Sequence, residues 1–112
     1  MSHDSIEVTS DDVDVVRFFH ELEHEIKIIN HEKISEIAGH VSRESFVNVA
    51  KTVARLRAKY IAKVIELQST DDISGKDVST LRGLRMMYEE SLEGFSALHH
   101  ALNRGYFSLS DQ

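Results

Sequence analysis

The 112-residue sequence contains no cysteine, no proline and no tryptophan. Without cysteine the chain can form no disulfide bond and offers no thiolate nucleophile, and we expect an intracellular, cytoplasmic protein. Proline interrupts helices, so its absence favours long helices joined by short turns. A membrane-spanning helix needs about 20 predominantly apolar residues, and the sequence has no such run, so we expect no membrane contact.

The first residues, MSHDSIEVTSDD, are acidic and polar, unlike a secretory or mitochondrial leader. Apolar residues make up 41% of the chain and charged residues 29%, which is the balance of a globular domain. We expect a flexible N-terminal tail at residues 1–9, a helical domain at residues 10–105 and a C-terminal tail at residues 106–112.

The first predicted helix begins at Ser10, whose hydroxyl is suited to accept a hydrogen bond from a free amide of the first turn. One apolar stripe at helical spacing follows, made of Val15, Phe18, Phe19, Leu22, Ile26 and Ile29. Lys33 and Glu36 would fall on the same stripe, so its phase fails near Asn30. We therefore expect a kink or break at Asn30–His31 and then a short helix ending at Gly39.

Two further long helices are predicted, at about 42–68 and about 74–103. The first of them is apolar over more than half its circumference, which indicates packing on two sides. Ser74 and Asp77 have the spacing of a capping box for the second. Three helices of similar length predict an all-α fold, an antiparallel three-helix bundle with a kink or short extra helix between helices one and two. The apolar residues Tyr106, Phe107 and Leu109 must fold back or meet a partner.

The string His20-Glu21-Leu22-Glu23-His24 matches H-E-x-x-H, the signature of zinc proteases. In those enzymes the two histidines bind zinc and the glutamate activates a water molecule. A third ligand is missing here, because the positions of the usual extension hold Lys27 and Asn30. The histidines also lie almost opposite the apolar stripe, so we expect them to face solvent or a partner and not a catalytic cleft.

Metal binding without catalysis is an open alternative, through His20, Glu21, His24 and His31. A pair of histidines one turn apart can hold zinc, copper or nickel weakly, and a second chain could complete the ligand set. Glu21 and His24 also have the spacing of the carboxylate–histidine pair of di-iron bundles, but those need a second pair that the sequence lacks. A solvated, histidine-rich face is the simplest interpretation, and a pH-responsive surface is a further one. We expect no cofactor, with zinc or iron as the alternative.

Charge is strongly segregated along the chain. Residues 1–36 carry ten acidic and three basic side chains, a net of −7, whereas residues 43–63 have a net of +5. In the second segment Lys51, Arg55, Lys59 and Lys63 recur every four residues and form a basic ridge. Arg57 falls on the apolar face of the same helix, where a guanidinium needs a partner or a route to water. It is expected to form a structural pair or an anion or partner site.

The sequence therefore predicts a cytoplasmic helical protein-interaction or regulatory module that forms a homo-oligomer and binds another protein. The predicted contact residues are Lys51, Arg55, Arg57, Lys59 and Lys63. The leading interpretation is a protein without enzymatic activity. One alternative is a metal-binding protein, including a metal-dependent hydrolase, that uses His20, Glu21 and His24. A second alternative is nucleic-acid binding through the basic ridge, which the net charge of −6 disfavours.

Overall fold

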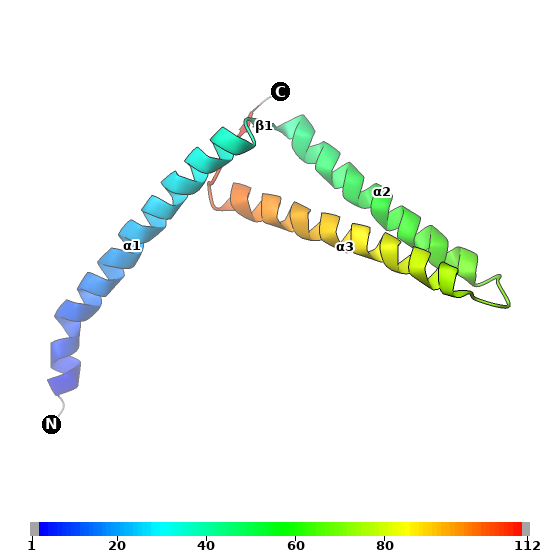
Figure 1. Cartoon of the computed structure of the whole chain (residues 1–112). Helices are drawn as coiled ribbons and strands as arrows, with labels where there is room; N and C mark the ends of the chain where they lie inside the picture. Colours follow the sequence, from blue (N-terminus) through cyan, green and yellow to red (C-terminus); the bar gives the residue numbers. More distant parts are fainter. Residues whose placement is uncertain (1–2, 111–112) are drawn as a thin grey trace.

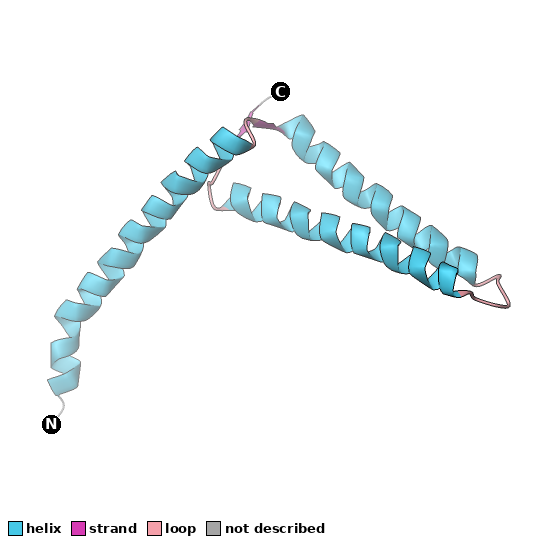
Figure 2. Ribbon diagram, in the orientation of Figure 1, coloured by secondary structure: helices cyan, strands magenta, loops and turns pink. Residues whose placement is uncertain are grey.

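The computed structural model describes the backbone of residues 3–110 and the side-chain burial of residues 12–110, and it confirms the all-α class. Its helices are α1 (His3–Ile37), α2 (Arg43–Leu67) and α3 (Gly75–Asn103). Two strands of two residues each, β1 (Val41–Ser42) and β2 (Leu109–Ser110), pair in parallel, with Val41 opposite Leu109. Figure 1 shows the order of these elements, and Figure 2 shows how small the strands are beside the helices.

Helices α2 and α3 form an antiparallel pair that holds most of the packing. Phe46, near the start of α2, meets Phe95 edge to face, with ring centroids 5.4 Å apart. Further along α2, Tyr60 stacks on Tyr88 at 6.2 Å. Of the residues whose burial is described, two apolar side chains are buried, Val53 at 4% exposure and Phe107 at 7%. The core of a single chain is therefore very thin.

Helix α1 projects away from this pair and packs along neither α2 nor α3 (Figure 1). The Cα radius of gyration is 23.1 Å, whereas a compact domain of this length has about 13 Å. The three-helix bundle predicted from the sequence is therefore not confirmed for the single chain. What the structure contains is a helix pair with a third, outlying helix.

The predicted break at Asn30–His31 is wrong, because α1 is one continuous helix to Ile37. Asn30 lies inside it, and its side-chain amide donates a hydrogen bond of 2.9 Å to the carbonyl oxygen of Ile26. The apolar residues can move to another side of α1 without a break in the helix, because no neighbouring helix packs along α1 and requires them all on one side. The helix also begins at His3 and not at Ser10, so residues 3–9 of the predicted tail are helical.

The ends of α1 and α3 are both fixed by a glycine in the left-handed region. Gly39 and Gly105 each have a φ of 77°, which favours glycine because a Cβ would be strained there. After Gly39 the chain enters β1, and after Gly105 it enters the segment that leads to β2. The C-terminal tail thus folds back, which is one of the two outcomes that the sequence left open, and it buries Phe107 against the end of α1 and the start of β1.

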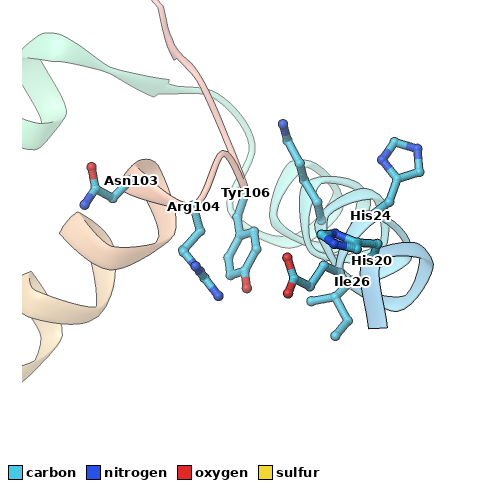
Figure 3. A pocket seen from close by; sticks show the side chains of 8 residues that line it. His20, His24, Ile26, Asn103, Arg104 and Tyr106 are labelled. Carbon is cyan, nitrogen blue, oxygen red and sulfur yellow. The ribbon is translucent and has the colours of Figure 1, made fainter. Parts of the chain in front are cut away.

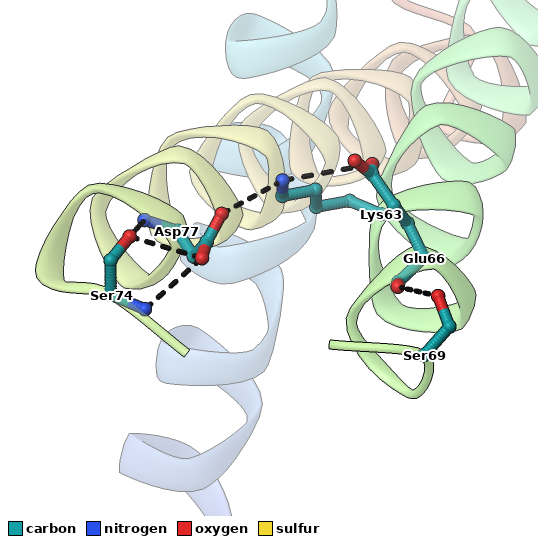
Figure 4. Close-up of polar contacts among 5 residues, drawn as sticks. All are labelled: Lys63, Glu66, Ser69, Ser74 and Asp77. Carbon is teal, nitrogen blue, oxygen red and sulfur yellow. Dashed lines mark hydrogen bonds and ion pairs between the residues drawn. The ribbon is translucent and has the colours of Figure 1, made fainter. Parts of the chain in front are cut away.

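Helix α3 begins with the capping box that the sequence predicts. The Ser74 hydroxyl accepts a hydrogen bond of 3.1 Å from the Asp77 amide, and the Asp77 carboxylate accepts one of 3.1 Å from the Ser74 amide. Figure 4 shows both bonds. Ser42 caps α2 in a similar way, since its hydroxyl accepts a bond of 3.0 Å from the Ser45 amide. Each cap satisfies amides that the first helical turn leaves without partners.

Removing the cap of α3 is expected to weaken the helix pair. We expect Ser74→Ala to lower the free energy of unfolding by about 1 kcal/mol, because one amide of the first turn loses its acceptor. Urea denaturation followed by circular dichroism at one fixed protein concentration measures the change. Ser79→Ala, on the exposed side of the same helix, is the matched control and should be neutral. Equal stability of the two variants would contradict the capping role.

Candidate interaction surface

The apolar residues of α1 are exposed along its length. Phe19 is 53% exposed and Ile29 is 51% exposed. Along the sequence, neighbouring residues of this surface are four and then three positions apart in turn. This is the pattern of a coiled-coil contact. We call them the α1 stripe: Val15, Phe19, Leu22, Ile26 and Ile29. No described helix packs along them, although Ile26 also lines a cavity at the end of α3 (Figure 3).

Acidic side chains border the α1 stripe on both sides. At 100° per residue, Glu25 and Glu32 fall on one border and Glu23 falls on the other. All three are exposed, and none has an ion-pair partner among the described residues. The α1 stripe is therefore an apolar surface with negative edges.

Helix α2 carries a second apolar surface besides the one packed against α3. Val47, Ala54 and Ile61 are spaced seven residues apart, and Ile65 lies one turn beyond Ile61. These four residues, the α2 stripe, lie about a third of a turn from Val53, which is buried against α3. Val47, Ile61 and Ile65 are 51%, 48% and 57% exposed. Helix α2 is thus apolar on two sides, as its sequence predicts, but one of the two sides is open.

Three members of the predicted basic ridge are available to a partner. Lys51, Arg55 and Lys59 are exposed and have no ion pair with another described residue. By helical spacing, Lys51 and Arg55 adjoin the α2 stripe. Lys63 is different, since its side chain is 14% exposed and its ammonium lies 3.4 Å from Asp77 and 3.6 Å from Glu66 (Figure 4). Lys63 therefore joins α2 to the capping box of α3.

Arg57 is held at the edge of the contact between α2 and α3. Its Nε donates a hydrogen bond of 3.1 Å to the Tyr88 hydroxyl, and its guanidinium carbon lies 5.3 Å from the centre of the Tyr88 ring. The residue is exposed, so the charge reaches water and needs no buried carboxylate. The structure thus gives Arg57 a contact with a tyrosine, where the sequence predicted either a structural pair or an anion or partner site.

Two of the three candidate histidines of α1 share a cavity. His20 and His24 line a cavity of about 440 Å³ between α1 and the end of α3, together with Glu23, Lys27, Arg104 and Tyr106. Figure 3 shows the His24 ring directed away from Arg104 and Tyr106. His31 lines a different cavity, beside His40 and Phe107. Glu21 lies on α1 and lines neither cavity.

Among the described residues, no group of three histidine or carboxylate side chains is placed to hold a metal ion. Lys27 and Arg104 also bring two cations to the cavity that His20 and His24 line. A metal ion would be repelled by both.

Two contacts on this surface were not predicted from the sequence. The ion pair of Lys63 with Asp77 and the hydrogen bond of Arg57 with Tyr88 both join α2 to α3. Pairing α2 and α3 as an antiparallel hairpin would have brought Lys63 near Asp77, because both lie close to the connecting loop. The β1–β2 pairing had no sequence signal, since each strand has two residues.

Comparisons with protein-family models, with curated proteins and with solved structures each found no match to this chain. No helix in the described part of the chain is long and apolar enough to cross a membrane. The function must therefore be inferred from the surfaces themselves.

Asp77 gives the helix pair a pH dependence. Hydrogen bonds from the Ser74 amide and hydroxyl, and then the Lys63 ammonium, hold the pKa of Asp77 below its ordinary value of 3.8, although partial burial opposes the shift. The ionised carboxylate therefore stabilises the fold above that ordinary value, and the stabilisation is lost as the pH falls through the lowered pKa.

We expect Asp77→Asn to be less stable than the wild type at pH 6, with a difference that shrinks as the pH falls below about 4. Thermal unfolding at several pH values measures this, and a difference that is constant with pH would contradict it.

Metal binding is testable on untagged protein. We expect elemental analysis to find no stoichiometric zinc or iron, and roughly tenfold excess zinc to raise the Tm by less than about 1 °C, because His20 and His24 have no third ligand beside them among the described residues. His20→Ala/His24→Ala is the control. Stoichiometric metal that this variant loses would contradict the expectation and return the H-E-x-x-H match to consideration.

Proposed function

We propose that this protein is a helical protein-interaction module that acts as a homo-oligomer and uses α1 as its assembly element. The main observation that supports this proposal is the exposed α1 stripe. Burying apolar surface contributes about 25 cal/mol per Å², and five large or branched side chains in one row form a continuous surface for it. An isolated helix of this kind is stabilised mainly by packing its apolar face against something else.

The total accessible surface supports a large interface. The chain exposes 8762 Å², whereas a folded monomer of 12.7 kDa exposes about 6,200 Å². The excess is about 2,500 Å² per chain, and obligate dimers bury about 2,000–5,000 Å² in total. Self-association would remove this excess, and it would complete the helical bundle that the sequence predicts with helices from more than one chain.

A protein surface suits the charges better than a nucleic acid does. The three available cations of the ridge stand on a chain with a net charge of −6, which repels phosphates beyond the ridge itself. No aromatic side chain interleaves them, so bases would find no stacking platform. A cytoplasmic location, expected from the cysteine-free sequence, is part of the proposal.

Acidic substitutions on the α1 stripe test the assembly. We expect Leu22→Glu/Ile29→Glu to reduce the molar mass from that of an oligomer to that of a single chain, because two charges would be buried at the contact. Light scattering coupled to size exclusion measures the mass, and far-ultraviolet circular dichroism follows the helices.

Val16→Glu/Ile28→Glu is the matched control. These residues are on the same helix and similarly exposed, at 54% and 46%, but they lie off the α1 stripe. The control should keep the mass of the wild type. A wild-type chain that is already monomeric, or a stripe variant that stays associated, would overturn the proposal.

A further inference from the structure

We infer that the surface that receives the α1 stripe is the α2 stripe of a second copy of this chain, with Lys51 and Arg55 as its positive border. The contact is reciprocal, so α1 of each copy lies on α2 of the other. This inference rests on the proposed self-association and names the surfaces that perform it.

Charge complementarity selects this pair of surfaces. The described α1 stripe has acidic borders at Glu23, Glu25 and Glu32, whereas Lys51 and Arg55 adjoin the α2 stripe. All five charges are exposed and have no ion-pair partner within the described residues. Two copies of α1 facing each other would place negative borders together, and two copies of α2 would place positive borders together. The α1–α2 contact is the combination that places opposite charges together.

The two stripes also agree in period and length. Both have apolar residues at intervals of seven, such as Leu22 and Ile29 on α1 and Ala54 and Ile61 on α2. At 1.5 Å per residue the α1 stripe is about 21 Å long and the α2 stripe about 27 Å long. Ala54, small and central, leaves room for a large side chain such as Phe19 or Leu22 of the other helix.

The connection after α1 favours a second copy over the same chain. Val41 and Ser42 follow α1 closely and are paired with Leu109 and Ser110. The side chain of Lys27 in α1 also lies close to Gly105, just after α3. A Cβ atom built on Gly105 would be 2.8 Å from Lys27 Cε. For α1 to lie on its own α2, the chain would have to give up this pairing and this contact. A second copy can occupy the α2 stripe while both are kept.

A two-fold dimer buries both stripes at once. In such a dimer the same pair of surfaces meets twice, so each copy both donates α1 and receives α1. No open stripe is left at either end, and the assembly closes at two copies.

Charge reversal on each surface tests the inference. We expect Lys51→Glu/Arg55→Glu and, separately, Glu25→Lys/Glu32→Lys to weaken self-association by about tenfold or more in Kd, since attraction becomes repulsion. Mixing the two variants should restore a dimer with one chain of each, because their reversed charges are again opposite. Sedimentation velocity measures each Kd, and native mass spectrometry identifies the mixed dimer.

Lys76→Glu/Arg82→Glu is the control for net charge. It changes the charge of the chain as much as the ridge variant does, but on exposed residues of α3, and it should keep the wild-type Kd. Ridge and control variants with equal Kd values, or no gain on mixing, would overturn the inference. The proposed function would still stand if Leu22→Glu/Ile29→Glu dissociated the dimer in the same assay, whereas a monomeric wild type would overturn both.

Discussion

The apolar surface of α1 is the constraint on which the rest of this structure depends. A helix that exposes Phe19, Leu22 and Ile29 to water loses the packing that normally stabilises a helix of this kind. No described helix packs along the surface. The pairing of β1 with β2 holds the C-terminal end of α1 near the end of α3, so α1 does not lie alongside the α2–α3 pair. We propose that the free energy that a compact domain gains within one chain comes here from contact between chains.

In the proposed assembly, the α2–α3 pair provides the surface that receives α1. Stacked and edge-to-face aromatic rings and the ion pair of Lys63 with Asp77 hold the two helices together. They use one side of α2 and leave a second apolar side open beside Lys51 and Arg55. The charges are segregated in the same way, with acids along α1 and free cations on α2. Segregation of this kind gives specificity and orientation to a contact whose main stabilisation is apolar.

The sequence predicted the local features well and the tertiary arrangement poorly. Ser74, Asp77 and Gly39 are local signals, and they placed a capping box and a helix end correctly. The break expected at Asn30–His31 assumed that the stripe must stay in phase with a bundle core, which α1 does not join. Packing between helices depends on contacts distant in sequence, so the exposure of the α1 stripe and the contacts of Arg57 and Lys63 had no local signal. The H-E-x-x-H match shows the opposite case: His20 and His24 line one cavity, but no third ligand lies beside them among the described residues.

The molar mass of the unmodified, untagged chain at low micromolar concentration tests the account most directly. Sedimentation equilibrium gives that mass without reference to shape, which matters for a chain with a radius of gyration of 23.1 Å. We expect twice the chain mass of 12.7 kDa, because the α1 stripe is then covered by a second copy. A mass of one chain, with the helices intact, would contradict the account.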